Sequence, residues 1–375
     1  MNAGNSSGIW RSIWHEPETG HVRIIDQTRL PHSLETRALK TLADACAAIR
    51  DMRVRGAPLI GVTAAFGVYL ALRENPASLP SAIDQLRATR PTAVNLCWAL
   101  ARAQRALAGT QESGIAGRAL RFAVELAAAD AACCAAIGEH GGGVLRGIWQ
   151  QKNRPDEPLR VLTHCNAGAL ATVEWGTALA VIHKAAASGI PLHVWVDETR
   201  PRNQGAALTC WELRRAGIDH SLIVDSAAGH AMASGLVDVC VTGSDRVSAA
   251  GDVCNKIGTY PVALAASDNA LPFYVALPVS TIDFDWPSMA TPIPIEERDA
   301  AEVSQATGID VNKSETRIRQ YPEQTPIRNF AFDITPARLV TGIITEHGVF
   351  EANQNSLVAL AGDDHRGRVS RMVKP

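Results

Sequence analysis

RVLTHCNAGALAT, residues 160–172, indicates the fold of the second half of this chain. The apolar run Leu159–Leu162 ends in polar residues, and the small residues that follow predict a helix. Short apolar runs precede helical segments four more times, in PLHVWV, SLIVD, VDVCVTG and PFYVAL. This alternation predicts βαβ units and a parallel sheet covered by helices on both faces. Ligands of such folds bind beyond the carboxyl ends of the strands, so the polar residues that end each run are the candidate site residues.

The first half has a helical texture. From Ser33 to about Gly143 the apolar spacing predicts successive amphipathic helices, and GRALRFAVELAAADAACCAAIGEHGGG, residues 117–143, ends in glycines that can stop a helix. The polar stretch IWQQKNRPDEPLR, residues 148–160, contains two prolines and predicts a domain boundary near 148–158. We therefore expect an α/β protein with a mainly helical domain over 1–150 and a sheet domain over 151–375.

The end of the chain is predicted to be helical and then frayed. In DITPARLVTGIITEHG, residues 333–348, Thr335 is in an N-cap position, Pro336 follows as the first helical residue, and Gly348 provides a stop. The polar tail GDDHRGRVSRMVKP, residues 362–375, is expected to be frayed.

The composition excludes several classes of protein. A net charge of −2 without a basic stripe argues against a nucleic-acid partner. The first ten residues lack a signal-peptide pattern, and we find no uninterrupted apolar run of about 18 residues, so we expect a cytoplasmic protein without a membrane span. The eight cysteines are dispersed, form no C-x-x-C and have no histidines at zinc spacing. Reduced thiols and no bound metal are expected.

Three basic positions are candidates for binding an anion. In RVRGAPLIGVTAAFG, Arg55, Gly56 and Ala57 precede a helix, whose free amides and positive dipole end favour anions. Arg90 stands before another helix start, and Lys256 lies among small and polar residues in GDVCNKIGTY. Each of these residues alone is also compatible with an ordinary solvated side chain. No P-loop or G-x-G-x-x-G accompanies them, so no nucleotide cofactor is expected.

A carboxylate and a thiol follow two of the predicted strands. Asp245 comes after VDVCVTG and can shuttle a proton, although a salt bridge or helix cap beside Arg246 is the structural alternative. Cys165 is a catalyst, a redox thiol or a small buried side chain. His164 would point to the opposite face of a continuing strand, which weakens the interpretation of Cys165 as a nucleophile. A strand-end thiol and carboxylate with several anion donors favour proton movement on a phosphorylated small molecule.

A second acidic pair belongs to a charged loop. Asp197 and Glu198 end the run HVWV, and Arg200 and Arg202 follow closely. We expect these four residues to form an ion-pair network that shapes the site.

A series of motifs resembles the methylthioribose-1-phosphate isomerase family, which is related to regulatory subunits of translation initiation factor 2B. The motifs cover about residues 22–350 and occur in this order: IIDQTRLP, MRVRGAPLIGVTAAFG, RPTAVNLCWAL, THCNAGALAT, DETRPRNQGAALTCWEL, GSDRVSAAGDVCNKIGTY, PFYVALP, IPIEER and FDITPARLVTGIITEHG. The resemblance implies a helical domain on a Rossmann-like domain, a homodimer, and aldose-ketose isomerisation of methylthioribose 1-phosphate in methionine salvage.

The resemblance also implies roles for individual residues. Asp245 and Cys165 would be the catalytic pair, and the substrate would be bound by Arg55, Gly56, Ala57, Arg90, Gln204, Asn255 and Lys256. No cofactor is implied.

Three questions stay open at this point. The first is the substituent at carbon 5, because 5-deoxyribose 1-phosphate and ribose 1,5-bisphosphate isomerases would share the same catalytic residues. The second is the mechanism: Cys165 either moves the C2 proton through an enolate or assists a hydride shift from C2 to C1. The third is whether the chain is instead a regulatory protein without catalytic activity, as initiation-factor subunits are.

Overall fold

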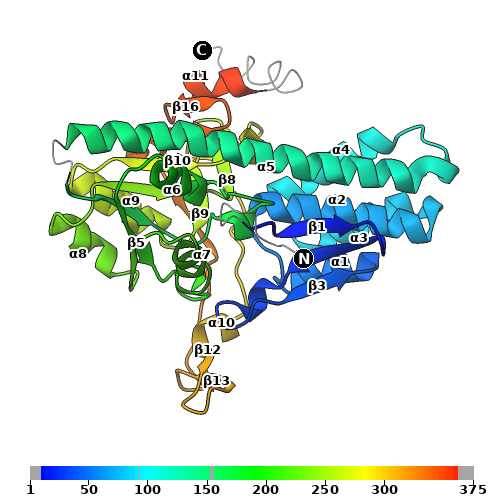
Figure 1. Ribbon diagram of the computed structural model, residues 1–375, viewed down its shortest axis with the longest axis horizontal. Helices are drawn as coiled ribbons and strands as arrows, with labels where there is room; N and C mark the ends of the chain where they lie inside the picture. The colour runs from blue at the N-terminus through cyan, green and yellow to red at the C-terminus, as the bar shows by residue number, and fades with distance from the viewer. Residues whose placement is uncertain (1–9, 92, 153–155, 362–375) are drawn as a thin grey trace.

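The computed structural model describes residues 10–91, 93–152 and 156–361. A mainly helical N-terminal part lies beside a sheet-containing C-terminal part (Figure 1). Helix α5 (Glu112–Gln151) runs along both parts and packs against α2 in the first and α6 in the second. The tail 362–375, predicted to be frayed, lies outside the described residues.

A small antiparallel sheet opens the N-terminal part. Its strands, in the order β1-β2-β3, are β1 (Ile13–Glu16), β2 (His21–Ile25) and β3 (Thr36–Leu39). The sequence analysis missed this sheet and wrongly predicted helices alone from Ser33 onward. Three of the five residues of β2 are buried, and both neighbouring strands pair with its backbone. Pairing with distant residues, which the local pattern does not reveal, decides the conformation.

Five α-helices account for most of the other described residues of the N-terminal part. They are α1 (Leu42–Arg50), α2 (Ala57–Glu74), α3 (Leu79–Thr89), α4 (Val94–Leu107) and α5. By length and composition α2 could cross a membrane, but 78% of its residues are buried inside the protein. This helix is therefore the centre of the N-terminal core, with α4 and α5 packed against it.

The glycines of α5 do not stop the helix, contrary to the sequence-based prediction. A Cβ atom at Gly141 would lie 2.3 Å from Cγ2 of Val181, and one at Gly138 would lie 2.9 Å from the carbonyl oxygen of Ala180. Both contacts are with α6 (Ala178–Ala187). These glycines allow the close approach of the two helices, and α5 continues to Gln151.

The C-terminal part is built on a seven-stranded sheet in the order β16-β15-β10-β7-β4-β5-β6. All neighbouring pairs are parallel except β15 and β16. The strands are β4 (Leu159–Thr163), β5 (Leu192–Asp197), β6 (His220–Ile223), β7 (Val239–Thr242), β10 (Phe273–Ala276), β15 (Gly342–Thr345) and β16 (Gly348–Phe350). The predicted fold class, a helical N-terminal part followed by a parallel-sheet part, is confirmed.

Helices cover both faces of this sheet. Alternate residues of each strand belong to different core clusters: Val161 and Val239 pack with α5 and α6, whereas Leu162 and Cys240 pack with α8 and α9. The covering helices of the C-terminal part are α6, α7 (Cys210–Arg215, preceded by the π-helical turn Gly205–Thr209), α8 (Ala227–Ala233) and α9 (Thr259–Asp268).

The strand order reverses between β4 and β7. From β4 the chain adds β5 and β6 on one side, then returns to β7 on the other side of β4 and adds β10 and β15 beyond it. In open parallel sheets, such a reversal leaves a crevice at the carboxyl ends of the two central strands. The fold therefore predicts a ligand site beyond Thr163 and Thr242.

A second sheet, in the order β11-β8-β9-β14, follows β7. It consists of β8 (Arg246–Ser248), β9 (Val253–Lys256), β11 (Ile282–Asp283) and β14 (Phe332–Thr335). Between β11 and β14 the chain forms α10 (Ala301–Ser304) and a hairpin that projects from the body, β12 (Gln305–Ile309) with β13 (Glu315–Arg319) (Figure 1). The short helix α11 (Gln354–Leu357) follows β16.

The helix predicted over residues 333–348 is wrong. Thr335 ends strand β14, and Gly342–Thr345 forms β15 beside β10. The run GIIT is fully buried, and β-branched residues suit a strand with cover on both faces. The cap-like residues Thr335, Pro336 and Gly348 instead lie at the ends of strands.

Candidate active site

Cys165 and Asp245 lie beyond the carboxyl ends of the two central strands. Cys165 follows β4 and Asp245 follows β7, and these strands are hydrogen-bonded neighbours. The strand order reverses between them, so both residues lie where an open parallel sheet binds its ligand.

One pocket is lined by every residue that the sequence analysis assigned to the site. These residues come from the N-terminal part, the large sheet and the second sheet: Arg55, Gly56, Ala57, Arg90, Cys165, Gln204, Asp245, Asn255 and Lys256. Met52, His164, Asn166 and Phe332 also line it. The structure thus brings all the predicted site residues together, while their chemical roles remain predictions.

The start of helix α2 forms one corner of the pocket. Gly56 caps the helix with a φ of 99° and no side-chain hydrogen bond. A Cβ atom there would lie 2.5 Å from the carbonyl oxygen of Ala171, so only glycine fits. The first amides of a helix have no partner within it, and the helix dipole adds positive potential at this end. The corner is suited to a phosphate group.

Two cationic side chains add to this potential. Arg90 follows α3 and forms an ion pair with Glu296 at 2.9 Å. Lys256, at the end of β9, is buried with its Nζ atom 4.8 Å from the centre of the Phe332 ring. Burial lowers the pKa of the Lys256 ammonium, and Cys165 and Asp245 oppose this shift. A bound anion would compensate the desolvation of this cation.

Arg55 binds the loop that carries Cys165. Its Nη1 atom donates to the main-chain oxygen of Asn166 at 2.7 Å, and its Nη2 atom donates to Oδ1 of the same residue at 2.6 Å. The buried guanidinium therefore orders the chain next to Cys165 in addition to lining the pocket.

Cys165 is held in an unusual backbone conformation. Its φ is 67°, which is rare for a residue other than glycine. Its amide donates to Oγ1 of Thr199 at 2.8 Å, and its carbonyl accepts from Oγ1 of Thr209 at 2.7 Å. Burial raises the pKa of the Cys165 thiol, although Arg55 and Lys256 oppose the shift. Burial thus favours the neutral form of the Cys165 thiol.

No regular helix begins directly after Cys165, which corrects the sequence-based prediction. The chain forms the 3-10 turn η3 (Ala169–Ala171) first, and α6 begins only at Ala178. The amides of Ala169 and Leu170 are bound by the Glu212 carboxylate, which replaces the hydrogen bonds of a helix.

Asp245 is positioned by its backbone and surrounded by cations. Its amide donates to the carbonyl oxygen of Cys254 at 3.1 Å, which ties the loop after β7 to β9. Burial raises the pKa of the Asp245 carboxyl, and Lys256, Arg90 and Arg55 oppose the shift. A carboxyl with a raised pKa can both donate and accept a proton near neutral pH.

Two amide side chains complete the pocket. Asn255 donates from Nδ2 to Oγ1 of Thr259 at 2.9 Å. The buried Oε1 atom of Gln204 has no hydrogen-bond partner in the part of the chain that the structure describes. A buried acceptor usually finds a donor, so Gln204 is suited to bind a substrate hydroxyl.

The sequence analysis missed Glu212 as a support of the site. This buried carboxylate of α7 accepts from Nδ2 of Asn166 at 2.9 Å and from the amides of Ala169 at 2.8 Å and Leu170 at 3.3 Å. The contacts join residues more than 40 positions apart, and no local motif announces them.

We expect Glu212→Ala to lower the free energy of unfolding by about 3 kcal/mol, because it leaves buried donors without an acceptor. Urea denaturation followed by circular dichroism measures this change. Glu125→Ala, at an exposed position of α5, is the matched control and should change the free energy by less than about 0.5 kcal/mol. Equal stabilities of the two variants would contradict the supporting role of Glu212.

The structure does not pair the four charged residues of this loop as predicted, namely Asp197, Glu198, Arg200 and Arg202. Asp197 and Arg202 each bind a partner outside this group. Asp197 is fully buried and binds Nδ1 of His164 at 3.0 Å. Arg202 forms an ion pair with Glu302 at 2.8 Å. Because Asp197 ends a strand with its side chain inside the protein, its carboxylate meets the buried imidazole and not the arginines of the loop.

His164, Asp197 and Asp225 place possible metal-ligand atoms within 4.8 Å of one another. Their hydrogen bonds argue against a metal site. Both His164 ring nitrogens already have partners, Asp197 and the carbonyl of Ile257. Both Asp225 oxygens accept backbone amides, those of Thr199 and Arg200.

The two-part fold has counterparts in known proteins. The chain belongs to the initiation factor 2 subunit family, whose family profile matches residues 53–352.

Within this family the chain is similar to proteins named as isomerases. It is 53% identical over 359 residues to the methylthioribose-1-phosphate isomerase of Methylorubrum extorquens, covering 95% of this chain and 98% of the relative. The crystal structure of 5-methylthioribose 1-phosphate isomerase from Pyrococcus horikoshii matches with a TM-score of 0.79 at 33% identity, covering 96% of both chains. The structure of translation initiation factor eIF-2B, subunit delta, from A. fulgidus matches with a TM-score of 0.75 at 39% identity, covering 91% and 96%.

Proposed function

We propose that this protein is an aldose-ketose isomerase that converts methylthioribose 1-phosphate to methylthioribulose 1-phosphate. The observation that carries the proposal is the placement of Cys165 and Asp245 at neighbouring strand ends, in a pocket with a helix start and two cations. The identity of more than half of the residues to a relative of that name supports the choice of substrate.

The phosphate corner fixes one end of the substrate. The amides of Gly56 and Ala57, with Arg90 and Lys256, bind the 1-phosphate. Arg55 supports this corner through its contacts with Asn166. Gln204 and Asn255 bind sugar hydroxyls, because each offers an amide to the pocket. The small phosphorylated sugar thus spans the crevice between the N-terminal part and the sheet.

The chemistry must keep the phosphate while the ring opens. The phosphate blocks the anomeric oxygen, so the substrate cannot open to a free aldehyde. Asp245 donates its proton to the ring oxygen as the bond from C1 to that oxygen breaks. C1 then carries positive charge that the phosphate-bearing oxygen shares. Burial raises the pKa of Asp245, which favours the protonated carboxyl that this step needs.

The second step moves hydrogen from C2 to C1. In the hydride route the hydrogen shifts with its electron pair, the O2 proton passes to Asp245, and C2 becomes the ketone. This returns Asp245 to its protonated form and leaves a CH2 group that bears the phosphate. In the enolate route Cys165 would remove the C2 proton as a thiolate. Burial raises the pKa of Cys165 and favours the neutral thiol, so we favour the hydride route.

In the hydride route Cys165 contributes by excluding water from C1. A water molecule that reached this carbon after ring opening would add a hydroxyl group beside the phosphate. The adduct would then collapse to the free aldehyde as its bond to the phosphate oxygen breaks, releasing inorganic phosphate. A neutral thiol beside C1 occupies that space without offering a reactive oxygen.

A comparison of three substrates tests the proposal. Purified protein is incubated with methylthioribose 1-phosphate, 5-deoxyribose 1-phosphate and ribose 1,5-bisphosphate, and kcat/KM is ranked. We expect methylthioribose 1-phosphate to rank first. A higher kcat/KM for either competitor would reassign the substrate, and no turnover of any would favour a regulatory protein.

We also expect a homodimer in the cytoplasm. Light scattering tests the oligomeric state, and fractionation of cells tests the location.

A further inference from the structure

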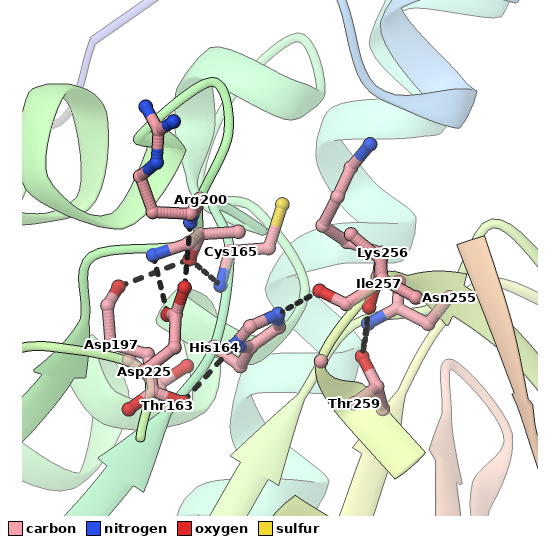
Figure 2. A network of polar contacts seen from close by, with 12 residues as sticks. Thr163, His164, Cys165, Asp197, Arg200, Asp225, Asn255, Lys256, Ile257 and Thr259 are labelled. Carbon is pink, nitrogen blue, oxygen red and sulfur yellow. Dashed lines mark hydrogen bonds and ion pairs between the residues drawn. The ribbon is translucent and has the colours of Figure 1, made fainter. Parts of the chain in front are cut away.

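His164 is a buried imidazole whose two nitrogens are both hydrogen-bonded. Nδ1 lies 3.0 Å from Oδ2 of Asp197, and Nε2 lies 2.9 Å from the carbonyl oxygen of Ile257. His164 is 1% exposed and Asp197 is fully buried. Figure 2 shows the ring between these two partners, with the side chains of Cys165 and Lys256 directed away from it on the same side.

The ring connects two separate sheets at the active site. His164 directly follows β4, and Asp197 ends β5, both in the seven-stranded sheet. Ile257 directly follows β9 in the second sheet. Cys165 is the neighbour of His164 in the chain, and Lys256 is the neighbour of Ile257. The side chain of His164 therefore links the backbone that carries the thiol to the backbone that carries the ammonium.

The segment after β9 is shaped to accept the ring. Gly258 has a φ of 104°, and a Cβ atom there would lie 2.6 Å from Cε1 of His164. The amide of Gly258 donates to Oδ2 of Asp333 at 2.8 Å, which fixes the turn from its other side. The imidazole thus packs against a position where only glycine leaves room for it.

Cys165 depends on such support because its conformation is strained. A φ of 67° in a residue with a Cβ persists only when the surroundings enforce it. Thr199 and Thr209 hold the amide and the carbonyl of Cys165. On one side of Cys165, the imidazole contacts hold residue 164 in place. On the other side, Arg55 holds Asn166 through a hydrogen bond to its main-chain oxygen.

The pair is able to hold a buried proton. Acidic groups face His164 from several elements: Asp197 at the end of β5, Asp225 after β6, and Asp333 on β14. Burial disfavours the imidazolium, but the hydrogen bond and charge of Asp197, with the charge of Asp225 and the hydrogen bond to Ile257, together raise the pKa of His164. Because Nε2 donates to a carbonyl, Nδ1 is left to share a proton with Asp197.

We infer that His164 and Asp197 form a positioning pair that holds Cys165 and Lys256 at the separation the reaction requires. The inference rests on the proposed function and adds two residues to it that do not touch the reacting carbons. Displacing a reacting group by about 1 Å costs on the order of 100-fold in rate. Loss of the pair should therefore lower kcat. It should leave Gly56, Ala57 and Arg90 of the phosphate corner in place and displace only Lys256 of that corner.

Three variants of the full-length protein test the inference. His164→Leu replaces the imidazole with an apolar side chain of similar size and removes both hydrogen bonds. We expect kcat to fall about 100-fold. KM should rise by a smaller factor, because Lys256 is the one phosphate-binding residue that loses its support. Asp197→Asn retains a donor for Nδ1, so it should keep kcat within about fivefold of wild type, whereas Asp197→Ala should lose about 100-fold.

A second readout does not require the substrate. The alkylation rate of Cys165 by iodoacetamide, followed by mass spectrometry of its peptide, should change at least about threefold in His164→Leu and stay near wild type in Asp197→Asn. His193→Leu is the matched control, since His193 pairs with Asp219 at 2.7 Å near the opposite end of β5. It should leave kcat and the alkylation rate unchanged.

The inference is overturned if His164→Leu keeps both kcat and the alkylation rate within about threefold of wild type. If His164→Leu does not fold, the aspartate variants decide, and equal kcat values for Asp197→Asn and Asp197→Ala would overturn it. Failure of the proposed function is a different result, because wild-type protein would then not convert the sugar phosphate. The alkylation rates would still test the pair.

Discussion

Asp245→Asn is expected to lower kcat by about 10³- to 10⁴-fold, because an amide can neither protonate the ring oxygen nor accept the proton of O2. The phosphate corner is built from other residues, so KM should change less than about threefold. Initial rates with methylthioribose 1-phosphate, measured at several concentrations, separate the two effects.

The control for this substitution is Asp268→Asn. Asp268 is exposed at the end of α9 and lies outside the pocket lining, so its variant should have wild-type kinetics. If Asp245→Asn kept the wild-type kcat, the assignment of Asp245 as proton carrier would be wrong. A large rise in KM at constant kcat would instead make Asp245 a binding residue.

Cys165→Ala is expected to lower kcat for the isomerisation by about 10²-fold, because the opened substrate is then less well positioned and no longer shielded from water. The alanine leaves a space beside C1 that water can enter, and water that attacks C1 after ring opening releases the phosphate. We therefore expect inorganic phosphate to appear during turnover of this variant. A phosphate assay run beside the isomerisation assay measures the partition between the two outcomes.

The role of the thiol is resolved by a substrate deuterated at C2. The hydride route carries the deuterium to C1, whereas substantial exchange with solvent would show that Cys165 acts as a proton base. Cys210→Ala is the matched control, because Cys210 begins α7 and does not line the pocket. Wild-type kcat in Cys165→Ala would contradict a catalytic role for the thiol.

The sequence predicted the strands and site residues correctly where an apolar run is followed directly by polar residues. Apolar runs predicted β4, β5, β6, β7 and β10. Strands buried on both faces, such as β7, are continuously apolar, whereas the edge strand β6 is only partly buried. Asp245 was a candidate because it follows one of these runs directly, and parallel strands place their carboxyl ends at one edge.

The errors arise where distant contacts decide the local structure. Cap-like residues around β15 indicated a helix, but GIIT is completely buried beside β10. The glycines of α5 indicated the end of a helix, but they instead allow α6 to pack closely against α5. Glu212 and Asp197 bind residues that are far away in the chain, so their partners could not be predicted from spacing.

The family motifs supplied what the residues alone left open. The sequence pattern alone was compatible with Cys165 as a core side chain or as a catalyst. It was also compatible with Lys256 as an ordinary surface lysine. The structure buries Lys256 in the same pocket as Cys165 and Asp245, with the strained Cys165 held by its neighbours on both sides. A buried cation beside a buried carboxyl is costly for folding alone, which favours a function that needs both.

The most direct test of the central claim is to follow methylthioribose 1-phosphate by ¹³C and ³¹P nuclear magnetic resonance with the wild-type protein present. We predict that a ketone carbon appears at C2 and that the phosphorus signal remains that of a sugar phosphate ester, with C1 converted to a CH2 group. An unchanged spectrum, or inorganic phosphate as the main product, would contradict the account.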